Sequence, residues 1–447
     1  MAAVRFTHWR RDANFTGAER TTPDDRAPTS VGRDNMNNDD IECRCCGARQ
    51  LVEFVNLGMS PLCESFIAKE QLNSMEPFYP LVAFVCRECH LVQLQEYVAP
   101  AEIFTEYAYF SAYSDAWLEH ARQYTEAMTK RFELGPASQV VELGSNDGYL
   151  LQFFARKKIP VLGIDPAANV AKAAEARGVP TLVSFFNTEA ALELVSKGVQ
   201  GDLVLGNNVL AQVSDLNSFV EGVRIILKVD GVCTVEFPHL LHTMAENQFD
   251  QIYHEHFSYF SLLSAETVFK RHGMRIFDLD ELWTHGGSLR IYVCHADAVA
   301  HPSTQAVDAM RRREKEAGLD RLETYSGFAE QVRVTKRKLL SFLIGAKSSG
   351  KIIVGYGAPG KGNTLLNYCG IRSDFLEYTV DRNPYKQGKY LPGTHIPILS
   401  PEIIMETRPD YVLILPWNLK DEIIQQLGFI RDWGGKFVVP IPDLSVM

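Results

Sequence analysis

The sequence has no long apolar run and no excess of basic residues. No stretch reaches about 18 apolar residues, the length that suggests a membrane-spanning helix, so we expect no membrane span. The 45 lysines and arginines are outnumbered by 55 aspartates and glutamates, which leaves a net charge of −10. A general nucleic-acid binder needs a basic face, so we expect no nucleic-acid partner. The start of the chain, MAAVRFTHWRRDANF, also lacks the apolar core of a secretory signal peptide.

Disulfides are a further expected absence, although the chain has nine cysteines. Without a secretion signal we expect a cytoplasmic protein, in which thiols or metal ligands are more common than disulfides. Four cysteines form two C-x2-C pairs, Cys43 with Cys46 and Cys86 with Cys89. Two such pairs supply the four soft ligands of tetrahedral zinc and leave no open position. The pattern predicts a structural zinc site, although Cys45 could compete with Cys43, and four buried free thiols are the alternative.

Residues 139–154, QVVELGSNDGYLLQFF, have the pattern of a strand, a glycine loop and a helix. Glycines let the backbone turn tightly and approach a ligand at the helix N-terminus. The spacing does not fit the dinucleotide motif G-x-G-x-x-G, but it suits the S-adenosylmethionine (AdoMet) loop of class I methyltransferases. The next strand ends at Asp165, where a carboxylate can accept both ribose hydroxyls. The candidate cofactor residues here are Glu142, Gly144, Asn146, Gly148 and Asp165, and a ligand-free α/β unit is the alternative.

The alternation of strands and helices continues to residue 295. Further strands are predicted at 181–187, 202–213 and 231–240, with two more within 277–295. Asn187, or its neighbour Phe186, could flank an adenine. Asn207 and Gln212 follow the fourth strand, at the edge where open α/β sheets bind ligands. Seven strands in this order predict a methyltransferase-like sheet.

The segment 249–263, FDQIYHEHFSYFSLL, is unusually rich in aromatic and titratable residues. Histidine titrates near neutral pH, and a neighbouring phenol or carboxylate tunes it, so the cluster could transfer protons. A metal site and a satisfied polar core are the alternatives. Because the cluster follows the fifth strand at the predicted ligand edge, we favour catalysis. Its candidate residues are Tyr253, His254, Glu255 and His256.

An aromatic segment at 102–124 contains Tyr107, Tyr109, Phe110, Tyr113 and Trp117. It predicts either the start of a helix that aromatic side chains pack, which we prefer, or an aromatic wall over a ligand.

A second glycine loop lies in 351–370, KIIVGYGAPGKGNTLLNYCG. The run from Gly355 to Gly360 matches the nucleotide fingerprint, and Asp381 ends the next strand. An NAD site, a remnant of the fold, and a platform for another phosphorylated ligand all remain open. Four basic residues could face a diphosphate there, namely Lys361, Arg382, Lys386 and Lys389.

These patterns predict an α/β protein of several domains, as a length of 447 residues suggests. The predicted parts are a disordered leader (1–40), a zinc-binding domain (41–98), an AdoMet-binding methyltransferase domain (99–300), a charged helical connector (301–346) and a smaller Rossmann-like domain (347–447).

Taken in order, the motifs CxxC…CxxC, YFSAYSDAW, VELGSNDG, FDQIYHEHFSYFS, THGGSLR and YGAPGKGNT resemble those of AdoMet-dependent sugar C-methyltransferases. This family acts in deoxysugar pathways such as those of tylosin (mycarose), novobiocin and tetrocarcin. The resemblance covers about residues 41–445. It implies a C-terminal domain without a redox cofactor, an active site between domains, and methyl transfer to C-3 of a TDP- or GDP-linked 4-keto sugar. It leaves a monomer or a homodimer open.

The resemblance also implies roles for the cluster. A base removes the C-3 proton, and the enolate carbon attacks the AdoMet methyl group. His256 is then the leading base, Tyr253 its partner or an alternative base, and Glu255 orients the histidine. Tyr107 lies near the sugar, and Tyr107, Tyr253 or His254 donates to the enolate oxygen. Gln212 departs from the family, which usually has a histidine at this position.

Two other classes of function stay open from the sequence. One is an O- or N-methyltransferase on a small metabolite. The other is a binding module or a nicotinamide-dependent oxidoreductase that uses the C-terminal glycine loop.

Overall fold

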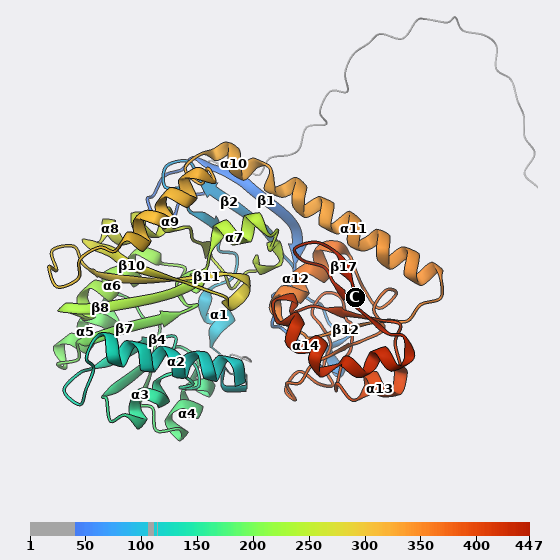
Figure 1. Ribbon diagram of the computed structural model, residues 1–447, viewed down its shortest axis with the longest axis horizontal. Coiled ribbons are helices and arrows are strands. Elements are labelled where there is room, and N and C mark those ends of the chain that lie inside the picture. The colour runs from blue at the N-terminus through green and yellow to red at the C-terminus, as the bar shows by residue number, and fades with distance from the viewer. Residues whose placement is uncertain (1–40, 106–110, 114) are drawn as a thin grey trace, which may run out of the picture. The chain divides into compact units, whose positions relative to one another are not determined.

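The computed structural model describes residues 41–105, 111–113 and 115–447, whose strands form three sheets (Figure 1). The predicted leader, 1–40, and Tyr107 of the aromatic segment lie outside the described residues. The predicted α/β class is confirmed, and none of the described helices combines the length and the apolarity needed to cross a lipid bilayer. The predicted domain limits remain predictions.

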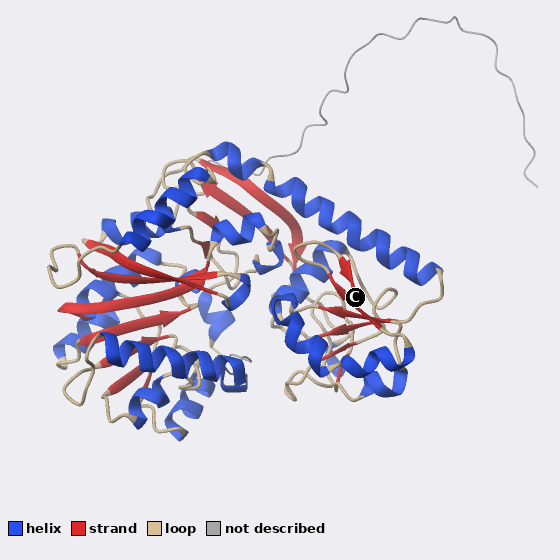
Figure 2. Cartoon of the chain, in the orientation of Figure 1, coloured by secondary structure: helices blue, strands red, loops and turns tan. Residues whose placement is uncertain are grey.

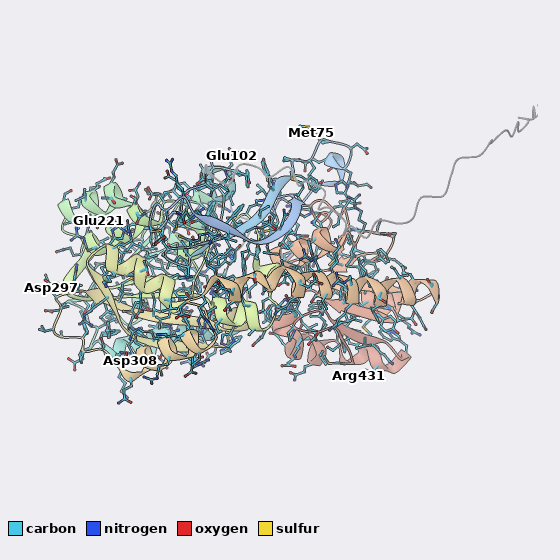
Figure 3. The ribbon with its side chains drawn as sticks, turned by 90° about the horizontal axis from the view of Figure 1, so that it is seen from above. Met75, Glu102, Glu221, Asp297, Asp308 and Arg431 are labelled. Carbon is cyan, nitrogen blue, oxygen red and sulfur yellow. The ribbon has the colours of Figure 1, made fainter. Side chains whose placement is uncertain are left out.

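The N-terminal sheet has the order β1-β2-β3-β9 and is antiparallel. It consists of β1 (Leu51–Ser60), β2 (Tyr79–Cys86), β3 (Val92–Leu94) and β9 (Ser258–Tyr259). The β1–β2 connection holds a short helix, η2 (Lys69–Gln71), and Met75, which is 95% exposed and lies at the rim of the molecule (Figure 3). The fourth strand comes from the histidine-containing cluster, since Val92 pairs with Tyr259 and Gln93 with Ser258.

The central sheet has seven strands, as predicted, in the order β10-β11-β8-β7-β4-β5-β6. β11 runs antiparallel to both of its neighbours, and the other pairings are parallel. β4 lies between β5 and β7, so the chain reverses its direction of winding there and opens a crevice at the carboxyl ends of these strands. The strands are β4 (Val140–Leu143), β5 (Val161–Asp165), β6 (Thr181–Val183), β7 (Gly201–Asn207), β8 (Leu227–Pro238), β10 (Met274–Leu282) and β11 (Ser288–His295).

Helices cover both faces of the central sheet (Figure 2). Neighbouring residues of a strand point to opposite faces, so Val140 packs into the core with Tyr124 and Phe154, while Val141 packs into the other core with Phe219. The helices are α1 (Pro100–Phe104), α2 (Asp115–Arg131), α3 (Leu151–Arg156), α4 (Ala168–Ala176), α5 (Thr188–Ser196), α6 (Leu216–Ile226), α7 (Leu240–Ala245) and α8 (Leu262–Arg271), with short turns η3 (Ser111–Tyr113), η4 (Leu210–Gln212), η5 (Phe249–Gln251) and η6 (Thr284–Gly286).

Two predicted strands are shorter than expected. The strand predicted at 181–187 ends at Val183, because the chain turns at Asn187, whose Oδ1 accepts the N–H of Ala190 and caps α5. The strand predicted at 202–213 ends at Asn207, and η4 follows it. Both segments therefore bring polar residues to the crevice instead of extending the sheet.

The segment 301–346 is helical, as predicted, and contains α9 (Gln305–Glu316), α10 (Leu322–Ser326) and most of α11 (Phe328–Ser348). Phe328 of α11 stacks on Phe54 of β1 with ring centroids 4.5 Å apart. Thr335 interrupts the apolar stripe of α11, and its Oγ1 accepts a hydrogen bond from Asn247 at 2.5 Å. The polar side chain of Thr335 therefore has a hydrogen-bond partner within the buried interface.

The C-terminal sheet is Rossmann-like, with the order β14-β13-β12-β15-β16-β17 and parallel pairing except at β17. Its elements are β12 (Ile353–Tyr356), α12 (Gly360–Cys369), β13 (Thr379–Val380), β14 (Ile398–Leu399), α13 (Ile403–Thr407), β15 (Tyr411–Ile414), η7 (Trp417–Leu419), α14 (Lys420–Gln426), η8 (Gly428–Trp433), β16 (Lys436–Val439) and β17 (Ser445–Val446).

The glycines of the C-terminal loop lie against protein atoms. Gly357 has φ of +87°, and a Cβ there would lie 2.6 Å from Cδ of Pro416. A Cβ on Gly360 would lie 2.8 Å from Sγ of Cys63 in the N-terminal domain. Close packing therefore accounts for these two glycines without a bound nucleotide.

Glu314 of α9 anchors the helical segment to the central domain. Its fully buried carboxylate accepts hydrogen bonds from the main-chain N–H groups of Leu262 at 2.5 Å and Leu263 at 2.9 Å, and from Nε2 of His239 at 2.7 Å. The first two bonds satisfy donors at the start of α8.

We expect Glu314→Ala to lower the free energy of unfolding by about 3–5 kcal/mol, because the change leaves buried donors without an acceptor. Chemical denaturation measures the effect, with the exposed Glu316→Ala on the same helix as the control. Equal stability of the two variants would contradict this assignment.

Candidate active site

A cavity of about 690 Å³ lies at the carboxyl ends of the central strands. All three regions of the fold contribute to its lining. Glu64 comes from the N-terminal region, Gly144 and Asp165 from the central sheet, and Lys361 and Asn418 from the C-terminal domain. Its size falls within the usual range of small-molecule sites.

The first glycine loop forms one wall of the cavity. Gly144 has φ of +63°, and a Cβ there would lie 2.5 Å from Cγ2 of Val209, so the position requires glycine. Asp165 holds the loop, since its Oδ2 accepts the N–H of Asn146 at 2.8 Å and its Oδ1 accepts the N–H of Ala167 at 2.9 Å. Burial raises the pKa of Asp165 above its ordinary value. Each oxygen keeps a further lone pair for a ligand hydroxyl.

Two asparagines at the end of β7 offer unused amides to the same wall. Asn207 and Asn208 line the cavity, and their side-chain oxygen and nitrogen atoms are buried without a hydrogen-bond partner among the described residues. Buried amides normally have partners, so these groups fit a ligand that carries both donors and acceptors. An amino-acid moiety and a ribose, as in AdoMet, have this character.

Three other predicted cofactor residues have contacts of different kinds. Glu142 is buried and absent from the described lining, and burial together with the nearby Asp165 raises its pKa well above the ordinary value. Gly148 lets the loop approach α4, since a Cβ there would lie 3.1 Å from Cβ of Ala174. Asn187 lines the cavity while its side chain caps α5.

His256 lines the same cavity in a defined tautomer. Its Nδ1 donates to the main-chain carbonyl of Gln251 at 3.0 Å, which leaves Nε2 as the proton acceptor. Its ring centroid lies 4.0 Å from that of Tyr253. Burial, with a smaller effect of the nearby Lys361, lowers the pKa of His256 to about 4. The imidazole is therefore neutral at pH 7 and able to take up a proton.

The other predicted catalytic residues are placed as follows. Tyr253, Glu255 and Gln212 line the cavity, and burial raises the pKa of Tyr253 well above its ordinary value, so its phenol stays protonated. The group that holds Nδ1 of His256 is the Gln251 carbonyl, and Glu255 Oε1 lies 3.5 Å from Sγ of Cys63. His254 is absent from the described lining, and its Nε2 lies 3.1 Å from the carbonyl oxygen of Pro80. The roles inferred for these residues stay predictions.

Part of the aromatic segment reaches the cavity. Trp117 lines it, stacks on His120 at 5.2 Å and meets the ring of His285 edge-on at 5.4 Å. His120 in turn donates through Nε2 to the buried carboxylate of Glu236 at 3.0 Å, which Arg290 also binds. This network fixes the start of α2 against β8.

Sequence reasoning assigned no role to His285, which lines the cavity between β10 and β11. The signal was the histidine followed by two glycines in THGGSLR. Of the basic residues expected near a diphosphate, Lys361 lines the cavity. Nζ of Lys386 lies 3.2 Å from Oε2 of Glu64, and Arg382 is 64% exposed.

The four cysteines of the C-x2-C pairs converge as predicted. Their sulfur atoms all lie within 4.8 Å of one another, with Cys43 and Cys89 at 3.4 Å and Cys46 and Cys86 at 3.5 Å. Thiolates bound to one zinc ion at about 2.3 Å lie roughly 3.8 Å apart, so the group fits zinc. Cys45 is buried beside them but is outside this set.

Comparison with known proteins places the chain in a family. C-methyltransferase NovU of Streptomyces niveus is 36% identical over 406 residues, which cover 91% of this chain and 96% of the relative. The chain belongs to the C-methyltransferase family. Family models also match a C-methyltransferase C-terminal domain at 283–442, a methyltransferase domain at 117–279 and a zinc binding domain at 43–104.

Two solved structures resemble part of this C-methyltransferase at low scores. An S-adenosylmethionine-dependent methyltransferase from Clostridium acetobutylicum is 11% identical, with a TM-score of 0.32 over 40% of this chain and 92% of its own. Magnesium protoporphyrin IX methyltransferase (ChlM) from Synechocystis is 13% identical, with a TM-score of 0.32 over 40% of this chain and 83% of its own.

The family confirms the resemblance inferred from the motifs. The protein is an AdoMet-dependent C-methyltransferase, and its N-terminal domain has a zinc site built from four cysteines. Neither alternative class considered from the sequence, an O- or N-methyltransferase or a nicotinamide-dependent oxidoreductase, matches this family.

We expect Cys43→Ser to lose the bound zinc and to lower the melting temperature, because zinc binding contributes directly to the stability of such small domains. Metal analysis by mass spectrometry and a thermal melt check both effects. Cys45→Ser is the matched control and should keep the metal. Loss of zinc from the control alone would instead make Cys45 the fourth ligand.

Proposed function

We propose that this C-methyltransferase transfers a methyl group to C-3 of a nucleotide-linked 4-keto sugar, after removal of the proton from that carbon. The observation that carries the proposal is His256, a neutral histidine with Nε2 as its acceptor, in one cavity with the glycine loop and Asp165. The curated relative, a C-methyltransferase, supports a carbon acceptor.

A carbon acceptor explains why the site has a base. A C–H bond is not nucleophilic, but a neighbouring ketone acidifies it, and a positioned base can then form the enolate. His256 takes up the proton at Nε2, and its Nδ1–H bond to Gln251 keeps the ring in place. The protonated phenol of Tyr253, beside it, donates to an oxygen of the sugar.

The part of the cavity that contains Asp165, Asn207 and Asn208 binds the cofactor in this proposal. Asp165 binds the ribose hydroxyls, and the amides of Asn207 and Asn208 bind the polar groups that the cofactor brings. AdoMet, when bound, supplies an electrophilic methyl group. The chain's own residues hold the sugar carbon toward it and exclude water. Gln212, which also lines the cavity, contributes a hydrogen bond without titrating.

We expect Asp165→Asn to weaken AdoMet binding by roughly 10- to 100-fold, since a charge-assisted hydrogen bond is worth about 1.5–3 kcal/mol. The amide keeps one oxygen, so only one of the main-chain N–H groups of Asn146 and Ala167 retains its acceptor. Calorimetry measures the change, with Asp308→Asn on α9, which is 60% exposed, as the control. An unchanged affinity would remove Asp165 from the cofactor site.

We expect His256→Asn to slow both methyl transfer and deuterium exchange at C-3 by about 10²- to 10⁴-fold, the usual contribution of a general base. Binding of AdoMet should persist. The assay uses mass spectrometry and proton NMR with TDP-, GDP- and UDP-linked 4-keto sugars, and His301→Asn, outside the cavity lining, is the control. Retained activity would transfer the role of base to Tyr253.

A further inference from the structure

Gln251 positions two histidines of the cavity at once. Its main-chain carbonyl accepts the Nδ1–H of His256 at 3.0 Å. Its side-chain Nε2 donates to the main-chain carbonyl of His285 at 3.0 Å and to Oε1 of Gln248 at 2.6 Å. One buried residue of η5 therefore holds both His256 and His285. A general base at His256 would not by itself require a link to a second histidine.

His285 is held in an unfavourable backbone conformation. Its φ is +54°, which is uncommon for a residue other than glycine and persists only where the surroundings enforce it. A Cβ on Gly286 would lie 2.5 Å from Trp417, and Gln248 Nε2 donates to the Gly286 carbonyl at 2.7 Å. The turn directs the imidazole to the cavity, where its Nε2 is buried without a partner among the described residues.

Lys361 brings a positive charge to the same place. It is 9% exposed, and among the described residues that line the cavity it is the single lysine or arginine. Its Nζ donates to Oδ1 of Asn418 at 2.9 Å and lies 4.8 Å from the centre of the Trp417 ring. Trp417 is fixed in turn by its Nε1–H bond to Asp250 at 2.7 Å. No salt bridge joins Lys361 to a carboxylate in the part of the chain that is described. Burial lowers the pKa of its ammonium group, and the nearby carboxylate of Asp250 raises it.

We propose that His285 and Lys361 together hold the carbonyl oxygen of the substrate while His256 removes the neighbouring proton. This inference rests on the proposed function and names the electrophilic side of the same reaction. It also gives the C-terminal domain a part in catalysis, through one lysine at the start of α12.

The bonds formed and broken in this proton transfer balance as follows. The C–H bond breaks toward Nε2 of His256, its electron pair forms the carbon–carbon double bond, and the carbonyl electrons move to oxygen. Burial lowers the pKa of His285 to about 3, so the ring is neutral and donates one N–H to that oxygen. The ammonium group of Lys361 offsets the negative charge. With AdoMet bound, the methyl–sulfur bond would break toward sulfur as the new carbon–carbon bond forms. The carbonyl then returns, and His256 keeps the proton until release.

The same lysine also acts on the base. The titratable groups around His256 are Tyr253, Glu255 and Tyr259 on its own segment, His285 from η6 and Lys361 from α12. Asp250 of η5 is the carboxylate that interacts with Lys361. Lys361 is the cation among them and lowers the pKa of His256. Its removal therefore raises that pKa and moves the acid limb of the kcat/KM profile to higher pH.

The first experiment replaces the charge in the full-length, zinc-loaded protein. Lys361→Met should slow deuterium exchange and methyl transfer by about 10²- to 10³-fold, the typical effect of losing a donor to an oxyanion, while AdoMet affinity stays unchanged. Lys361→Arg should recover part of the rate, and the exposed Lys436→Met is the control. Wild-type exchange in Lys361→Met, or an acid limb that does not move, would overturn the proposal.

The second experiment removes the donor of His285. We expect His285→Phe to slow exchange at C-3, and His285→Gln, which keeps an N–H donor, to retain more of the rate than Phe. Equal rates for the two variants and the wild type would overturn the role of His285. If His285→Phe does not fold, the pH profile of Lys361→Met tests the proposal instead.

A wild-type protein that neither exchanges nor methylates any 4-keto nucleotide sugar would refute the proposed function, and this inference with it.

Discussion

The pairing of β9 with β3 is the contact on which the active site depends. Leu94 donates its N–H to the carbonyl of Phe257 at 3.0 Å, and Val92 pairs with Tyr259, so the chain just after His256 becomes a strand of the N-terminal sheet. The turn between β2 and β3 carries Cys86 and Cys89, two of the four zinc ligands. A zinc ion bound there would therefore stabilise the strand against which the segment of His256 lies.

The η5 turn supplies the second constraint. Thr364 of α12 donates to the carbonyl of Ile252 at 3.1 Å, and Asp250 binds Trp417, so this turn joins the C-terminal domain to the catalytic segment. Asn363 also donates to the carbonyl of Cys63 at 2.6 Å, which closes the contact with the N-terminal region. Burial at this junction lowers the pKa of both His256 and His285. A neutral imidazole can accept a proton at one nitrogen and donate a hydrogen bond from the other.

The two glycine loops illustrate how one motif serves different physical ends. In the central domain, Gly144 lets the backbone pass Val209 at the rim of the cavity, and unused amides lie nearby. In the C-terminal domain, Gly357 and Gly360 admit Pro416 and Cys63 instead. Asp165 and Asp381 each accept an N–H from their own loop, so even this shared feature supports loop geometry in both cases. The two loops differ in which polar side chains beside them have no hydrogen-bond partner among the described residues.

The sequence by itself determined the local patterns. The apolar strands with their alternating faces, the glycine loop at Gly144 and each C-x2-C pair follow from short-range spacing, because each pattern spans a few residues or repeats a simple period. It also indicated that Tyr253 and His256 belong to a site. Tertiary structure alone decided what surrounds them. The partner of His256 is a main-chain carbonyl, which no side-chain motif reveals, and Lys361 reaches the cavity from more than 100 residues away in the chain. Long-range packing sets the burial that makes the histidines neutral, and burial cannot be read from spacing.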